Sequence, residues 1–174
     1  MIVPRSMTPQ EILLPVKPAF IVATLITALT INLLPVSGWW LACRPDFVAL
    51  VLLFWCIDQP RKIGFTTAWL LGLVMDVSDG SLFGQHALAY SILAYAGIVL
   101  HRRVQRFSAT PQVLHVIPLL LLNDLIVLIV RLATGSDFPG YFYFAGSVIG
   151  GLLWPLLLVL LKLPQRPRGD PDHV

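Results

Sequence analysis

Charged residues are scarce in this sequence. Only 12% of its 174 residues are Asp, Glu, Lys or Arg, whereas 57% are hydrophobic. A soluble domain carries about a quarter of its residues as charged side chains, which gives it polar surface on every side. The composition therefore excludes an ordinary water-soluble domain.

Cysteine is also scarce, and it lacks the motifs that would give it a chemical role. The two cysteines, Cys43 and Cys56, lie in or beside apolar runs and form no CxxC pair. Buried cysteines usually behave as small apolar side chains. We therefore expect structural thiols, and the spacing predicts neither a disulfide nor a zinc site.

What the sequence does contain is a series of apolar segments. Such runs predict an all-α polytopic inner-membrane protein, with six transmembrane helices in one domain over residues 1–163 and a disordered cytoplasmic tail over 164–174. The second segment is doubtful as a full span, because its length corresponds to about 18 Å of helix against a hydrocarbon core of about 30 Å. It is expected to be short, tilted or re-entrant. The segments cover residues 18–35, 46–57, 63–78, 86–101, 111–133 and 141–163.

The basic residues predict how these segments are oriented. With a cytoplasmic N-terminus, residues 79–85 and 134–140 form outer loops. These two loops contain no Lys or Arg. Because cytoplasmic loops are enriched in basic residues, both termini are predicted to be cytoplasmic, where basic loops meet anionic lipid; no nucleic-acid role follows. A five-span alternative with an outer N-terminus misplaces only Arg5 and Lys17. The basic residues on the predicted inner side are Arg5, Lys17, Arg61, Lys62, Arg102, Arg103, Arg106, Lys162, Arg166 and Arg168.

Acidic residues gather toward the predicted outer side, together with the two remaining arginines. Unpaired charge near lipid is costly, so the arginines are the expected partners of these aspartates. Asp124 and Arg131 share one face of the fifth segment about 10 Å apart, so each is expected to reach another helix. They form either a buried pair that fixes helix register or a contact for a partner or ligand. The candidate partner- or pocket-facing residues are Arg44, Asp46, Asp76, Asp79, Asp124 and Arg131.

Small residues predict where helices pack closely. At a four-residue spacing they let a neighbouring helix approach, and prolines inside two segments, Pro118 and Pro155, predict local kinks. Gly80 and Gly84 are typical of a tight turn between the third and fourth segments. The predicted packing residues are Gly64, Ala68 and Gly72 in the third segment and Gly146 and Gly150 in the sixth.

The stretch GLVMDVSDGSLFGQHAL, residues 72–88, concentrates acids, glycines and a histidine, as an active site would. Asp76 and Asp79 match the start of the D-x-x-D-G signature of CDP-alcohol phosphotransferases, but the rest of that signature is missing. An aspartyl protease built on Asp76 and Asp124 would need a GxGD motif, and a serine hydrolase using Ser78 or His86 would need a GxSxG elbow. Neither motif is present. We therefore expect no catalytic residue, cofactor or metal, and aspartates that close the turn or face a periplasmic partner.

Four stretches, taken in order, resemble the MreD family of rod shape-determining membrane proteins. They are RPDF at 44–47, QPRK at 59–62, the 72–88 stretch and HRRV at 101–104. The resemblance implies a non-enzymatic role with a periplasmic MreC-like scaffold, an actin-like MreB homologue and a wall-synthesis glycosyltransferase and transpeptidase. It also implies a fold similar to the substrate-binding subunits of energy-coupling-factor transporters.

Two hypotheses about function follow. The first is a non-enzymatic inner-membrane component of the cell-elongation machinery, which maintains rod shape by organising partner membrane proteins. The second is a protein that binds a small molecule or lipid headgroup, or a transporter substrate-binding subunit, with an outer-facing pocket. The sequence has no nucleotide-binding loop, so energised transport would require separate subunits.

Overall fold

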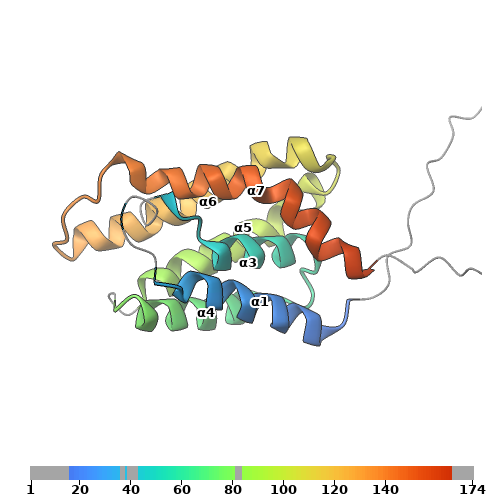
Figure 1. Cartoon of the computed structure of the whole chain (residues 1–174), viewed down its shortest axis with the longest axis horizontal. Coiled ribbons are helices and arrows are strands. Elements are labelled where there is room, and N and C mark those ends of the chain that lie inside the picture. The colour runs from blue at the N-terminus through green and yellow to red at the C-terminus, as the bar shows by residue number, and fades with distance from the viewer. Residues whose placement is uncertain (1–15, 36–37, 39–42, 81–83, 166–174) are drawn as a thin grey trace, which may run out of the picture.

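The protein folds as a helical bundle. The computed structural model describes residues 16–35, 38, 43–80 and 84–165, and these contain helices and no strand. Arg5, Arg166, Arg168 and residues 166–174 of the predicted tail lie outside the described residues. The elements in Figure 1 are α1 (Pro18–Leu33), α3 (Phe47–Asp58), α4 (Phe65–Ser78), α5 (Gln85–Val104), α6 (Ala109–Ala133), the short 3-10 helix η1 (Tyr141–Phe144), α7 (Ala145–Lys162) and η2 (Leu163–Gln165).

The all-α fold class is confirmed, and the described residues contain six α-helices. Each predicted segment contains one α-helix, and the ends differ by only a few residues. The largest extension is in α5, which continues through His101, Arg102 and Arg103 to Val104 because cations are favourable in the last turn of a helix. Two helical stretches, Ala109–Ala133 and Phe142–Gln165, are long and apolar enough to cross a membrane. Spanning by all six helices stays a prediction.

α3 is the central helix of the bundle. All ten residues from Val48 to Ile57 are buried, and α3 packs against α1, α5, α6 and α7. Figure 1 shows it between α1 on one side and α6 and α7 on the other. A helix that is apolar on every face is stable only when every face is covered. Its neighbours provide that cover, so this short helix needs little contact with lipid.

The other helices carry apolar side chains on their outward faces. In water, apolar surface of this extent would drive association, whereas in lipid it is the favourable outer surface. The bundle therefore has the surface of a protein embedded in a bilayer. The exposed side chains include Val22, Ile26 and Leu33 of α1, Phe65, Leu70 and Val77 of α4, Leu88, Tyr95 and Val99 of α5, Leu114, Leu125 and Ile129 of α6, and Leu152, Leu156 and Leu160 of α7.

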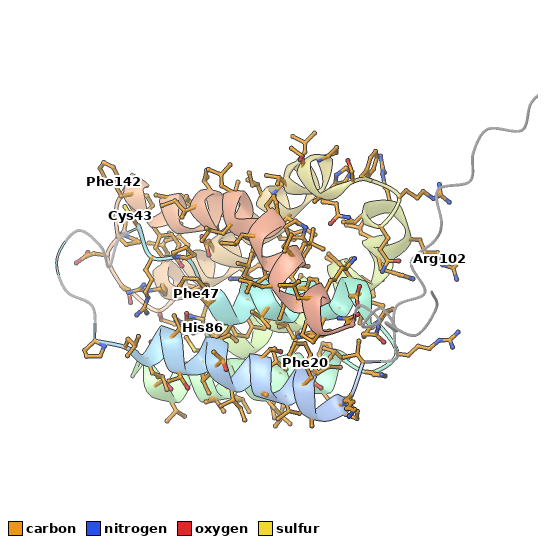
Figure 2. The ribbon with its side chains drawn as sticks, turned by 45° about the vertical axis from the view of Figure 1, so that its right-hand side comes forward. Phe20, Cys43, Phe47, His86, Arg102 and Phe142 are labelled. Carbon is orange, nitrogen blue, oxygen red and sulfur yellow. The ribbon has the colours of Figure 1, made fainter. Side chains whose placement is uncertain are left out.

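Charge divides the bundle into two ends. At the basic end, Lys17 precedes α1, Lys62 lies between α3 and α4, and Lys162 closes α7. Contacts join this end: the Lys162 Nζ lies 3.7 Å from Asp58 Oδ1, and the Lys62 Nζ donates to the Val16 carbonyl at 2.6 Å. In Figure 2, Arg102 marks the basic end, and Cys43 and Phe142 mark the opposite, acidic end.

Glycines bring two pairs of segments into close contact. A Cβ on Gly72 would collide with the backbone of Ala87, which places α4 directly against α5, with Ala68 also buried. A Cβ on Gly146 would lie 2.5 Å from the Arg44 carbonyl oxygen, and one on Gly150 would make only ordinary contacts. Gly64 is different, because it precedes α4 as its N-cap and a Cβ there would meet nothing within 4 Å.

Two packing glycines were missing from the sequence-based prediction. A Cβ on Gly97 would lie 3.0 Å from Leu53 Cδ1 of α3, and one on Gly151 would collide with Ile117 of α6. Gly97 has no small residue four positions away to mark it as part of a stripe, because Leu93 and His101 occupy those positions. These glycines let α5 approach α3 and let α7 approach α6.

We expect Gly72→Ala to lower the free energy of unfolding by about 2 kcal/mol, because the added methyl group displaces the backbone of α5. Gly64→Ala, at the N-cap of α4 where a Cβ would meet nothing, is the control and should change it by less than about 1 kcal/mol. Denaturant unfolding of the purified protein in detergent measures both values. Equal effects of the two substitutions would contradict the close α4–α5 packing.

Candidate functional site

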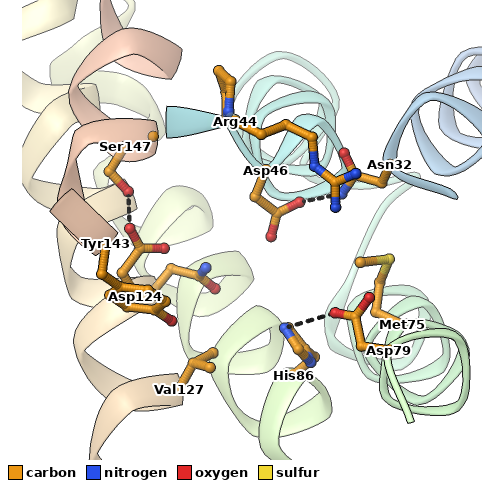
Figure 3. A pocket seen from close by; sticks show the side chains of 13 residues that line it. Asn32, Arg44, Asp46, Met75, Asp79, His86, Asp124, Val127, Tyr143 and Ser147 are labelled. Atoms are coloured by element: carbon orange, nitrogen blue, oxygen red, sulfur yellow. Dashed lines mark hydrogen bonds and ion pairs between the residues drawn. The ribbon is translucent and has the colours of Figure 1, made fainter. Parts of the chain in front are cut away.

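A polar cavity lies at the acidic end of the bundle, where residues from α1, α4, α5, α6 and α7 meet the stretch before α3 (Figure 3). Its volume is about 160 Å³. Four of the six candidate residues line it, namely Arg44, Asp46, Asp79 and Asp124, whereas Asp76 and Arg131 do not. The other lining residues are Asn32, Pro45, Met75, His86, Asn123, Val127, Tyr143, Gly146 and Ser147.

Asp46 holds three helices together at this cavity. Its Oδ1 accepts hydrogen bonds from the Asn32 Nδ2 at 2.8 Å and from the Ala49 amide at 3.0 Å, and its Oδ2 accepts from the Tyr90 hydroxyl at 2.6 Å. The Ala49 bond makes Asp46 the N-cap of α3. Asn32 completes the arrangement because its Oδ1 accepts from the Phe47 amide at 3.1 Å. Asp46 therefore links α1, α3 and α5.

Asp76 has a structural role beneath the cavity. Its side chain is fully buried and accepts from the Gly84 amide at 2.7 Å and from the His86 amide at 2.8 Å. The first amides of a helix have no partner inside the helix, and a carboxylate there is doubly favourable because of the helix dipole. Asp76 of α4 thus caps the N-terminus of α5. It closes the turn, which is one of the two roles expected for it.

His86 connects Asp76 to the cavity. Its Nδ1 donates to Asp76 Oδ1 at 2.9 Å, since a carboxylate can only accept. Its Nε2 lies 3.8 Å from Asp79 Oδ2. Figure 3 marks this contact between His86 and Asp79 with a dashed line. From the sequence, His86 was a candidate only for the base of a serine hydrolase. No local signal in the sequence identifies the contact between His86 and Asp76, because it depends on how α4 packs against α5.

Asp124 joins α6 to α7. It accepts a hydrogen bond from the Ser147 hydroxyl, and both residues face the cavity. The neighbouring Asn123 is only 2% exposed, and its Oδ1 has no hydrogen-bond partner among the described residues. The α6 side of the cavity therefore presents acceptors that the bundle does not fully satisfy.

The expected pairing of the two arginines with the aspartates is wrong within the described part of the chain. The ion pairs there that involve aspartates are made by His86 and Lys162. The Arg44 Nη1 instead donates to the Leu34 carbonyl at 3.3 Å, and Arg131 interacts with the Tyr143 side chain. Asp46 and Asp76 do not need the arginines, because backbone amides and polar side chains already donate to them.

The side chains that line the cavity are suited to binding a polar group. It combines carboxylate and amide acceptors with a guanidinium, an imidazole and two hydroxyls. Among the described residues, no three His, Cys, Asp or Glu side chains converge closely enough to hold a metal ion. Small-molecule pockets usually enclose about 300–1,000 Å³, so the volume of this cavity suits a single polar head group.

An all-helical bundle with an apolar exterior and a polar cavity at one end defines a small membrane-embedded protein. The family model described as rod shape-determining protein MreD matches residues 16–163, and the chain therefore belongs to the MreD family. The chain is similar to the rod shape-determining protein MreD of Haemophilus influenzae, with 27% identity over 146 residues that cover 84% of this chain and 90% of the relative. No solved structure matches. Membership places the protein in a family that acts in determining rod shape.

We expect Asp76→Ala to lower the free energy of unfolding by about 3 kcal/mol, because it leaves buried amides at the start of α5 without an acceptor. Asp79→Ala is the matched control, since the Asp79 side chain is 40% exposed and makes a 3.8 Å contact with His86. Its effect should stay below about 1 kcal/mol. Unfolding of the detergent-purified variants measures the difference, and a stable Asp76→Ala protein would contradict the capping role.

Proposed function

We propose that this protein is a non-enzymatic, multi-pass component of the bacterial inner membrane that serves the cell-elongation machinery. In this role it maintains rod shape by binding and organising the proteins that build lateral peptidoglycan. The proposed partners are a periplasmic MreC-like scaffold, an MreB-like actin homologue and a wall-synthesis glycosyltransferase and transpeptidase. The observation that carries the proposal is the family match over residues 16–163.

The distribution of side chains supports a scaffold. The helices around α3 present apolar faces outward, which suits contact with lipid or with the helices of other membrane proteins. The two ends carry opposite charge, so a periplasmic and a cytoplasmic partner would each meet a distinct surface. The cavity residues make hydrogen bonds that hold helices in place. A protein that organises partners requires such fixed surfaces and does not require a catalytic site.

The second hypothesis, a transporter substrate-binding subunit, is less well supported. The cavity of about 160 Å³ is small for a vitamin-sized ligand. The similarity to energy-coupling-factor subunits stays a prediction. We therefore favour the scaffold.

We further propose six spans with both termini in the cytoplasm. In a full-length protein whose two native cysteines are replaced, Ser136→Cys should react with a membrane-impermeant maleimide in intact cells. Arg106→Cys and Lys17→Cys should react only after the membrane is permeabilised. Labelling of Lys17→Cys in intact cells would contradict six spans and favour five, because only the N-terminus changes side between the two arrangements.

Depletion of the protein should convert rod-shaped cells into round ones without changing vitamin uptake, because lateral wall synthesis loses its membrane organiser. Microscopy of depleted cells measures the change in length-to-width ratio. Wild-type protein and Gly64→Ala, which alters no helix contact, should both restore rods. Cells that remain rods after the protein has disappeared would overturn the proposal.

A further inference from the structure

The polar cavity at the acidic end contains more negative than positive charge. Asp46, Asp79 and Asp124 line it, and Arg44 is the one basic side chain with a permanent charge in its lining. His86 does not reverse this balance, because its ring lies between two carboxylates, those of Asp76 and Asp79. Carboxylates held at the end of a largely apolar bundle are stabilised by an opposite charge. The cavity is therefore suited to a cation.

A second observation is independent of charge. Asn123 lines the cavity and is only 2% exposed, yet its Oδ1 has no donor among the described residues. A buried acceptor without a partner destabilises the protein, because it has lost its hydrogen bonds to water. A hydrogen-bond donor in the cavity would remove that destabilisation. A group that is both cationic and a hydrogen-bond donor would therefore suit both features of the cavity.

The size of the cavity and the arrangement of its acceptors restrict which cationic group it can bind. A water molecule occupies about 30 Å³, so a cavity of about 160 Å³ holds one small head group. The acceptors come from three places around it: Asp46 before α3, Asp79 after α4, and Asn123 with Asp124 on α6. An ammonium group, whose donors radiate from one nitrogen, suits such an arrangement better than the planar fork of a guanidinium.

We propose that this cavity binds a primary ammonium group, supplied by a lysine side chain of a partner protein. A lysine adds one positive charge to a cavity with excess negative charge. The ethanolamine headgroup of a phospholipid would bring a phosphate with its ammonium and leave that excess unchanged. The assignment to a partner rests on the proposed function, whereas ammonium binding does not.

Binding is tested with n-butylammonium, which reproduces the end of a lysine side chain, on the full-length protein in detergent. At about ten times its dissociation constant it should raise the melting temperature by about 3 °C. Tetramethylammonium, which cannot donate a hydrogen bond, and sodium at equal ionic strength should not. Equal shifts with all three salts, or no shift with any, would overturn the proposal and leave a cavity filled by water.

The Asn123→Leu variant tests whether n-butylammonium raises the melting temperature by binding in this cavity. It removes the unpartnered acceptor and should abolish the butylammonium shift. The matched control is Ser91→Ala, because the Ser91 Oγ is also buried without a partner but does not line the cavity; it should keep the full shift. If Asn123→Leu fails to fold, Asp79→Asn, at a 40% exposed position, should weaken butylammonium binding about threefold. A full shift in the folded cavity variants would contradict this site.

The source of the ammonium is identified in native membranes with a carbodiimide, which joins a carboxylate to an amine in contact with it. Mass spectrometry of peptides that contain Asp79 or Asp124 should show a cross-link to a lysine of another protein. Attachment of phosphatidylethanolamine instead would overturn the partner assignment while leaving ammonium binding intact. The scaffold proposal is judged separately, by cell shape after depletion.

Discussion

The enclosure of α3 is the constraint on which the rest of the bundle depends. Ten consecutive buried residues require protein on every side, and α1, α5, α6 and α7 provide it. Close approach of α5 is possible because Gly97 leaves room for Leu53 and Cys56. Asp46 then fixes the start of α3 against α1 and α5 through Asn32 and Tyr90. Once α3 is covered, the outer faces of its neighbours are left to lipid.

Much of the fold could be predicted from the sequence, because apolar segments, turn glycines and basic helix ends are local signals. The site was predicted only in part. Asp46, Asp79 and Asp124 were identified from their charge, but the expected pairing with arginines was wrong. Local sequence does not show that Asp76 reaches amides eight and ten residues away, or that His86 then becomes its partner. Those contacts depend on how α4 and α5 pack.

Family membership and the structure each support the proposed scaffold role. The family match places the chain among rod shape-determining proteins. The structure adds a polar cavity whose hydrogen bonds fasten α1 to α3 and α6 to α7 at one end. An occupant of that cavity would contact several helices at once. Binding there would be sensitive to any rearrangement of the bundle.

The burial of α3 has a consequence for biogenesis. Its partners α5, α6 and α7 all follow it along the chain, so a growing polypeptide releases α3 before most of its cover exists. A 12-residue helix is only about 18 Å long, so without that cover α3 would be a poor match for a hydrocarbon core of about 30 Å. Synthesis of α7 completes the enclosure. The order of helix synthesis thus makes the C-terminal helices the last step that stabilises the centre.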